Sequence, residues 1–210
     1  MIQLFIKGGP IMWPLFIASV LTLSVVIDRV VFLLRHRPRR NSRDVEQMMA
    51  LVGDGKLTAA SQVGNSSGNA VARVLAAGLE HADTCYEESI MCAANQELAH
   101  YEQGTGLLDT VVTLAPLLGL LGTVTGMIRS FGLLGASELE APVAITGGIA
   151  EALIATGFGL GIAIFALIPL NILSTSKVSL ELAIEEAATR VEILLKSRGS
   201  RVQVKQLRAV

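Results

Sequence analysis

The chain has 210 residues, of which 51% are hydrophobic and only 17% are charged, and its mean hydropathy is +0.57. This balance is too apolar for an ordinary soluble domain and predicts an integral membrane protein. The net charge of −1 excludes a general electrostatic attraction to nucleic acid. Three long apolar segments predict an all-α fold with three transmembrane helices.

Residues 1–10 form a short head that ends in a Gly-Gly-Pro sequence. The first span is predicted at residues 11–34, with Trp13 as an anchor at one membrane interface. Five arginines crowd the C-terminal flank of this span between Arg35 and Arg43, whereas the head offers only Lys7 and the amino group. Because lysine and arginine collect on the cytoplasmic side of membrane proteins, we expect a periplasmic N-terminus.

Residues 35–106 are polar enough to lie in water, and loops rich in Gly, Ser and Asn separate their short helical patterns. We therefore predict a cytoplasmic helical region here. Thr84 and Glu87 have the spacing of a capping box, which predicts that a helix begins after Thr84 as its cap.

The second span is predicted at residues 107–128. Pro116 lies within it and should kink the helix locally. Gly119, Gly122 and Gly126 are three and four residues apart, so they share one helix face. Small residues on one face let neighbouring membrane helices approach closely, so this face is predicted to pack against another helix.

A periplasmic loop at residues 129–146 leads to the third span at residues 147–173, which returns to the cytoplasm. Gly157 and Gly161 in this span are also predicted to contribute to helix packing. Residues 174–210 are predicted to extend the third span as an amphipathic helix that joins a cytoplasmic helical bundle and ends in a basic tail.

The apolar stripe of this last helix needs a partner to cover it. We expect either the helix around Cys92 or the same helix in a neighbouring subunit. The two segments predicted to be cytoplasmic hold fourteen of the 17 Lys and Arg residues, which favours a periplasmic N-terminus and a cytoplasmic C-terminus. The stripe consists of Leu180, Ile184, Ala187, Val191 and Leu194.

Glu151 stands near the start of the third span, and an ionisable residue in an apolar span is costly enough to suggest a functional role. Equally open is the interpretation that Glu151 only marks the boundary with water. Thr123 and Thr156 both fall about 7–8 Å inside the same boundary, at about 1.5 Å per residue, so they are predicted to share a layer. Taken singly, each threonine is better explained by a hydrogen bond to its own helix.

The glycine faces shift this balance, because small residues mark helix contacts rather than lipid-facing surface. Hydroxyls and a carboxylate that line a helical pore can hold water and relay protons. Three helices hardly enclose a pore, but several copies arranged in a ring could do so, with a second acid on a partner helix. Enzyme motifs such as HExxH, GxSxG and GxxxxGK[ST] are absent, so we expect no enzyme and no metal or organic cofactor.

Two segments strongly resemble the signature spans of the MotA/TolQ/ExbB proton-channel family: Leu114–Phe131, LAPLLGLLGTVTGMIRSF, and Gly147–Ile164, GGIAEALIATGFGLGIAI. The three-span layout is similar to the ExbB/TolQ branch. The resemblance implies a homopentameric ring in the inner membrane of a Gram-negative bacterium. Within the ring it implies the single spans of an ExbD/TolR-like partner, whose membrane aspartate carries the proton.

The same resemblance implies that Thr123, Glu151 and Thr156 line the pore and that protons are the translocated ion. Their inward flow would energise a TonB- or TolA-like protein for outer-membrane transport or envelope maintenance. The alternative function is a non-conducting inner-membrane scaffold that assembles its partners through the cytoplasmic helices.

Overall fold

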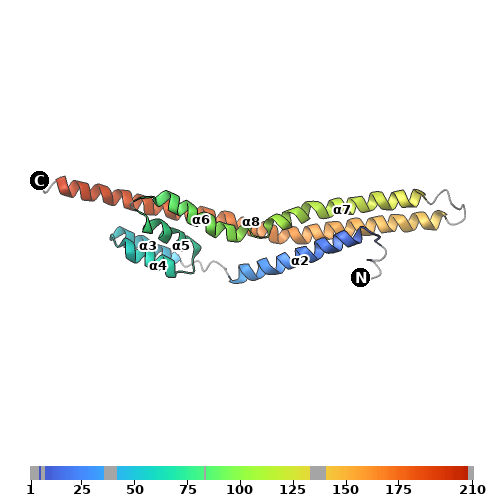
Figure 1. Ribbon diagram of the computed structural model, residues 1–210, viewed down its shortest axis with the longest axis horizontal. Helices are drawn as coiled ribbons and strands as arrows, with labels where there is room; N and C mark the ends of the chain where they lie inside the picture. The colour runs from blue at the N-terminus through green and yellow to red at the C-terminus, as the bar shows by residue number, and fades with distance from the viewer. Residues whose placement is uncertain (1–4, 6–7, 36–41, 83, 133–140, 208–210) are drawn as a thin grey trace. The chain divides into compact units, whose positions relative to one another are not determined.

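The computed structural model describes residues 5, 8–35, 42–82, 84–132 and 141–207. Every regular element among these residues is an α-helix (Figure 1), so the predicted all-α class is confirmed for this part of the chain. The helices are α2 (Met12–Arg35), α3 (Ser42–Gly53), α4 (Leu57–Ser66), α5 (Ala70–Glu80), α6 (Tyr86–Glu102), α7 (Thr105–Gly132) and α8 (Ala141–Leu207).

Three of these helices are long and apolar enough to cross a bilayer. They are Met12–Leu33 in α2, Thr105–Gly132 in α7 and the apolar part of α8 after Thr146. About 20 residues at a rise of about 1.5 Å each match a hydrocarbon core of about 30 Å. The three predicted spans are therefore present as helices, and the chain is a multi-pass membrane protein.

The chain divides into two compact units. The membrane unit comprises Met1–Leu34 and Gly104–Ile172, and the polar unit comprises Arg35–Gln103 and Leu173–Val210. Helix α8 contributes its first part to the membrane unit and its second part to the polar unit. Most of the predicted head, residues 36–41 of the arginine-rich flank, residues 133–140 of the predicted loop and the last three residues lie outside the described part of the chain.

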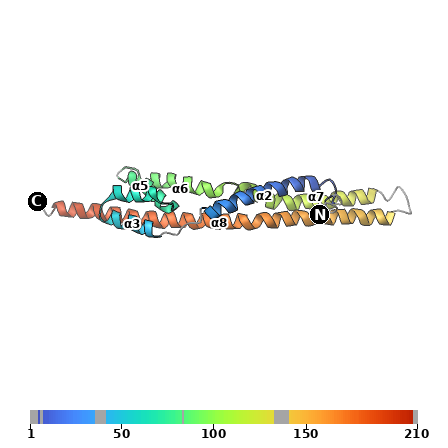
Figure 2. The same cartoon turned by 90° about the horizontal axis from the view of Figure 1, so that it is seen from below.

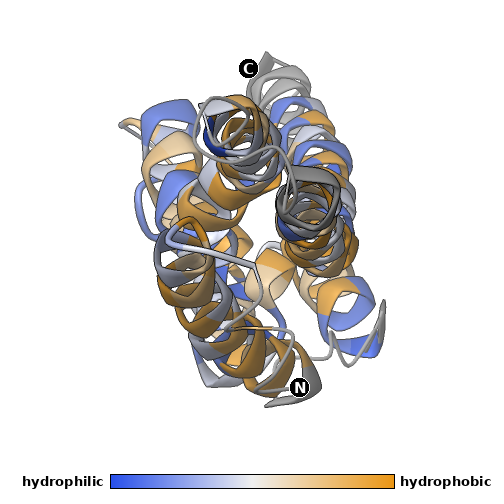
Figure 3. Ribbon diagram, turned by 90° about the vertical axis from the view of Figure 1, so that its right-hand side faces the viewer, coloured by the Kyte–Doolittle hydropathy of each residue, from blue (hydrophilic) through white to orange (hydrophobic). Residues whose placement is uncertain are grey.

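In the membrane unit, α7 lies alongside the first part of α8 in both side views (Figures 1 and 2). Large apolar side chains are exposed on all three helices of this unit, among them Trp13 of α2, Leu117 of α7 and Leu153 of α8. The ribbon of α2 is coloured mainly as hydrophobic in the end-on view (Figure 3). Such a surface is unfavourable in water but is covered by lipid tails or by other helices in a bilayer.

The polar unit has a hydrophobic core of a kind common in soluble proteins. Helix α5 lies at its centre, because seven of its 11 residues are buried. The apolar stripe of α8 enters the same core through Ile184, Ala187 and Val191, and α6 adds Ile90. The stripe thus finds its partner within its own chain, and the helix around Cys92, one of the two expected partners, contributes to it.

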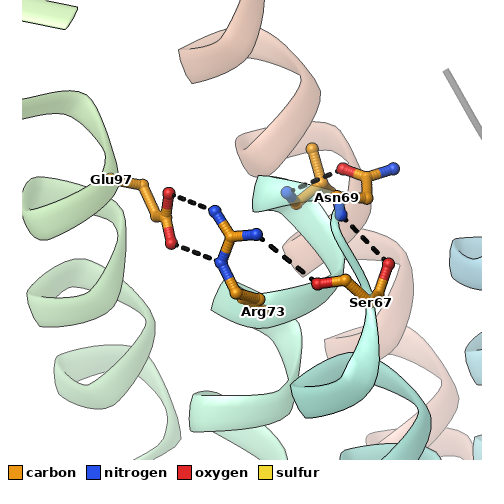
Figure 4. Close-up of polar contacts among 5 residues, drawn as sticks. Ser67, Asn69, Arg73 and Glu97 are labelled. Carbon is orange, nitrogen blue, oxygen red and sulfur yellow. Dashed lines mark hydrogen bonds and ion pairs between the residues drawn. The ribbon is translucent and has the colours of Figure 1, made fainter. Parts of the chain in front are cut away.

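A polar network joins α6 to the connection between α4 and α5 (Figure 4). The Arg73 guanidinium donates two hydrogen bonds of 2.7 Å to the Glu97 carboxylate and one of 3.4 Å to the Ser67 carbonyl oxygen. The Asn69 side chain caps α5 by accepting a hydrogen bond of 3.0 Å from the Val71 N–H. Hydrogen bonding to Glu97 raises the pKa of Arg73.

The predicted helix cap at Thr84 is wrong. Helix α6 begins at Tyr86, and the cap position belongs to Cys85, whose side chain makes no capping hydrogen bond. The chain leaves α5 through a tight turn in which the Thr84 N–H donates to the His81 carbonyl oxygen at 3.1 Å. The Thr84 hydroxyl lies 3.6 Å from Sγ of Cys85, and the sequence spacing alone did not reveal this turn.

Candidate functional site in the membrane unit

Helices α7 and α8 approach each other through residues with little or no side chain. On α7 the contact runs along Gly119, Gly122 and Gly126, which are all buried. A Cβ atom at Gly119 would lie 3.0 Å from the Cα of Thr156, and one at Gly126 would lie 3.0 Å from the Cβ of Ala152. There is no room for a side chain on this face, so the two backbones pack closely.

The α8 side of this contact was not identified from the sequence. A Cβ atom at Gly159 would lie 2.5 Å from the carbonyl oxygen of Ala115, and one at Gly122 would lie 2.5 Å from the Cβ of Ala155. This side of the contact could have been predicted from a row of small residues spaced four and three residues apart, because alanine as well as glycine allows membrane helices to approach closely. The row consists of Gly148, Ala152, Ala155 and Gly159.

Gly157 and Gly161, the two glycines selected from the sequence, lie on another face of α8. A Cβ atom at either position would meet nothing within 4 Å. They line a groove of about 500 Å³ between α2 and α8, together with apolar side chains such as Phe158. Their role in helix packing stays a prediction, and it would concern contacts with other chains.

The Thr156 hydroxyl bridges the two helices of this contact. It donates a hydrogen bond of 2.9 Å to the carbonyl oxygen of Gly119 on α7. The expected alternative, a bond to the preceding turn of its own helix, is therefore not the one found. Gly119 lies about one helical turn before Thr123, so Thr156 contacts α7 close to the other threonine of the predicted layer.

Thr123 behaves differently from Thr156. Its hydroxyl donates a hydrogen bond of 2.7 Å to the carbonyl oxygen of Leu120 in its own helix. It also lines a shallow hollow on α7 with Val124, Met127 and other apolar side chains. In the single chain, Thr123 thus satisfies its hydroxyl locally and borders a surface open to water, lipid or another helix.

Glu151 forms an ion pair with a residue of the other helix. Its Oε1 accepts a hydrogen bond of 3.1 Å from Nη1 of Arg129, near the C-terminal end of α7. The Glu151 side chain is 21% exposed and the Arg129 side chain is 56% exposed. A nearby cation offsets part of the cost of placing a carboxylate at the edge of an apolar span. No partner for Glu151 had been predicted from the sequence.

The same oxygen of the Glu151 carboxylate, Oε1, also faces an N-terminal turn at Gly8, Gly9 and Pro10. Gly9 has a φ angle of +73°, and a Cβ atom there would overlap the Glu151 carboxylate. A Cβ atom at Gly8 would lie 3.2 Å from the side chain of Ile154. The turn therefore packs against α8 near the start of the predicted third span.

Both long helices continue through a proline. Pro116 lies inside the 28 residues of α7, and Pro169 lies inside α8. Helical structure extends on both sides of Pro116, and the local kink predicted there stays a prediction. A proline removes one backbone hydrogen bond, which leaves the carbonyl oxygen one turn earlier available to another donor.

The polar side chains in the middle of the α7 span are hydroxyls. Between Asp109 and Arg129 the polar side chains of α7 are threonines, and each of them donates to a carbonyl oxygen of α7. Among the described residues, no group of three or more His, Cys, Asp and Glu side chains is arranged to hold a metal ion. A single copy offers hydroxyls within the membrane and a paired carboxylate at one end, which suits water and proton binding better than covalent chemistry.

Comparison with known proteins gives a family for this architecture. Residues 66–186 match the MotA/TolQ/ExbB proton channel family. The ExbB-like 1 protein of Synechocystis sp. is 37% identical over 177 residues, which cover 80% of this chain and 68% of that protein. The ExbB-like 3 protein of Synechocystis sp. is 31% identical over 192 residues, covering 89% of this chain and 91% of that protein.

The biopolymer transport protein ExbB of Pseudomonas putida is 30% identical over 200 residues, covering 88% of this chain and 59% of that protein. The family match takes in more than half of the chain, including all of α7 and the whole of the predicted third span. The chain therefore belongs to the MotA/TolQ/ExbB proton channel family, in its ExbB/TolQ branch.

Proposed function

We propose that this chain is the proton-channel subunit of a membrane motor driven by the proton motive force. The observation that carries the proposal is that the family match covers α7 and the part of α8 that hold Thr123, Glu151 and Thr156. The family is of the channel type, which favours ion conduction over catalysis at a soluble active site. Protons are the proposed translocated ion, and no cofactor is required.

The proposed location is the bacterial inner membrane, with the N-terminus in the periplasm and the C-terminus in the cytoplasm. The asymmetric distribution of Lys and Arg supports this orientation. The Arg129–Glu151 pair then lies at the periplasmic end of the membrane unit, and the polar unit lies in the cytoplasm.

A conducting assembly needs several copies, because three helices do not enclose a pore. We place α7 and α8 at the centre of a homopentameric ring and α2 toward the lipid. Exposed apolar side chains on both inner helices, including Leu120, Val124 and Ile164, offer surfaces for contacts between copies or with a helix inside the ring.

The missing acid is assigned to an ExbD/TolR-like partner whose single span carries an aspartate inside the ring. Hydroxyls suit the neighbouring pore wall because they orient water without imposing a fixed charge. Thr156 uses its proton on Gly119 and keeps oxygen lone pairs to accept a hydrogen bond from water. Glu151 stands at the pore mouth, where Arg129 holds it.

Proton flow supplies enough energy for mechanical work. Each proton yields about 2.3 kcal/mol per 100 mV of membrane potential, so a few protons per step suffice without nucleotide. The work is proposed to act on a TonB- or TolA-like protein for outer-membrane transport or envelope maintenance. The alternative, a non-conducting scaffold, is not favoured by the family match.

The test has two stages. The chain is first co-purified with the candidate single-span protein, and the complex is then reconstituted into liposomes with a pH-sensitive dye inside. We expect a potential of the correct sign to acidify the interior, and we expect Glu151→Ala and Thr156→Ala each to lower the flux about ten-fold. The matched control is Thr189→Ala, because the Thr189 hydroxyl also donates to a backbone carbonyl oxygen, that of Glu185, but lies in the polar unit.

Flux that is unchanged in both test variants would contradict the pore-lining roles. A complex that forms in fixed ratio but carries no protons would support the scaffold instead.

A further inference from the structure

The N-terminal turn at Gly8, Gly9 and Pro10 is tied firmly to the first span. The Gly8 N–H donates to the Phe5 carbonyl oxygen at 3.2 Å, and the Met12 N–H donates to the Gly9 carbonyl oxygen at 3.2 Å. The Phe5 ring packs edge-on against Trp13, with 5.5 Å between ring centroids. Gly8 and Met12 are both buried. The backbone at Gly9 is therefore fixed from both sides.

Glycine is required at position 9 for two separate reasons. Its φ angle of +73° costs an ordinary L-residue about 1 kcal/mol or more. In addition, a Cβ atom would overlap Oε1 of Glu151 and lie 2.7 Å from its Cδ. The first reason concerns the turn alone. The second couples the turn to the Glu151 carboxylate of α8.

Two other parts of the membrane unit therefore lie next to Oε1 of Glu151. Arg129 of α7 holds it through the 3.1 Å hydrogen bond, and the backbone of the turn blocks movement on the Gly9 side. Arg129 belongs to α7 and the turn comes just before α2, so α7, α8 and the turn before α2 meet at this carboxylate.

We propose that the turn at Gly8–Pro10 is a positioning element for Glu151, which keeps its carboxylate against Arg129. The inference rests on the proposed function in so far as Glu151 acts in proton flow. Gly9 itself does not touch the proton, and it acts through the carboxylate. The first span then has a second role besides facing lipid, because its leading turn sets the geometry of the pore mouth.

The experiment uses steric compensation. Gly9→Ala in the full-length chain, assembled with its single-span partner, is expected to lower proton flux about ten-fold because the carboxylate is displaced from its place. Glu151→Asp shortens the side chain by one methylene and makes room for the new Cβ atom. The double variant Gly9→Ala/Glu151→Asp is therefore expected to conduct as well as Glu151→Asp alone. A ten-fold loss from Gly9→Ala in both backgrounds would overturn the inference.

Backbone strain is controlled with Gly55→Ala. Gly55 has a similar φ angle of +82° but belongs to the polar unit, so this variant is expected to leave proton flux unchanged. An equal loss of flux in Gly55→Ala and Gly9→Ala would contradict the positioning role, because strain alone would then account for the effect.

A readout without flux separates this inference from the proposed function. The same variants are compared by the melting temperature of the purified full-length chain. We expect Gly9→Ala to lower the melting temperature by several degrees when residue 151 is the native Glu. The decrease should be smaller in a Glu151→Asp or a Glu151→Ala background. If the melting temperatures depend on residue 151 in this way but the native complex carries no protons, the proposed function is contradicted and the positioning role is not. If the native complex carries protons but Gly9→Ala lowers the melting temperature equally in all three backgrounds, the positioning role is contradicted and the proposed function is not.

Folding provides the last check. If Gly9→Ala does not fold, removal of the carboxylate by Glu151→Ala should restore a folded chain, because the steric overlap is gone. Failure of both the single and the double variant to fold would overturn the inference.

Discussion

The membrane unit and the polar unit of this chain pack their helices in opposite ways. In the membrane unit, α7 and α8 meet through backbone and small residues, so that a single added methyl group at Gly159 would collide with a carbonyl oxygen. In the polar unit, the contacts are made by large side chains such as Met48, Leu75 and Val191, which are completely buried. The same helix, α8, takes part in both kinds of contact.

The difference follows from the surrounding solvent. In water, burial of apolar side chains is the main source of stability, at about 25 cal/mol per Å². In lipid, the tails are as apolar as leucine, so helices gain stability mainly from close contact and from hydrogen bonds between them. The interhelical bond from Thr156 to Gly119 belongs to this second kind.

The largest effect should come from the core of the polar unit. Leu75→Ala removes a side chain that is 0% exposed and is expected to lower the free energy of unfolding by about 2–5 kcal/mol. Leu182→Ala is the control, because Leu182 on α8 is 60% exposed. Thermal unfolding of both variants checks this expectation. Equal losses would mean that the core is not where the stability of this unit lies.

The next effect should come from the membrane unit. Gly159→Ala adds a methyl group 2.5 Å from a backbone oxygen of α7 and should destabilise the chain by about 1–3 kcal/mol. Gly161→Ala, two residues along the same helix, meets nothing within 4 Å and should be neutral in the isolated chain. Melting of the two variants in detergent makes the comparison, and a neutral Gly159→Ala would disprove backbone-limited packing.

A smaller effect is expected at the polar network in Figure 4. Arg73→Gln removes the paired hydrogen bonds to Glu97 and should cost about 1 kcal/mol, since the pair is partly exposed. A double-mutant cycle with Glu97→Gln measures the coupling between the two side chains. The Arg190–Glu186 pair on the surface of α8 serves as reference and should give about 0.3 kcal/mol. A coupling free energy between Arg73 and Glu97 no larger than that of the reference pair would mean that the network does not stabilise the packing of α6.

The smallest effect concerns alkaline pH. Burial, with a further contribution from Glu192, raises the pKa of Tyr86, so the unfolded chain loses this proton at a lower pH than the folded chain. Stability should therefore be complete below the ordinary pKa of about 10 and fall as the pH rises above it. Tyr86→Phe should flatten this part of the curve, although it also loses the bond to the Ala188 carbonyl oxygen. Unfolding curves at several pH values between about 9 and 11 test this, and an unchanged slope would contradict it.

The sequence predicted the features that depend on local composition. Apolar runs are visible in a linear chain and predicted the three spans, and the spacing of Gly119, Gly122 and Gly126 places them on one helix face. The capping box at Thr84 failed because a tight turn from α5 takes up that residue.

The side-chain contacts between distant segments of the membrane unit could not be predicted. The ion pair of Arg129 with Glu151, the packing of Gly9 on the same carboxylate and the direction of the Thr156 hydroxyl all depend on how α2, α7 and α8 are rotated about their axes. A one-residue difference in helix rotation, about 100°, would place each of these side chains elsewhere. Depth along a span can be counted from the sequence, but rotation cannot.

The central claim is that the Thr156 hydroxyl lies on the proton path, and two substitutions test it directly. Thr156→Ser keeps the hydroxyl, whereas Thr156→Val keeps the shape and should cost the helix contact only about 0.6 kcal/mol. In the reconstituted complex with the single-span partner, we predict proton flux within about two-fold of the native value for serine and about ten-fold lower for valine, with equal assembly. Native flux through the valine variant would contradict the claim.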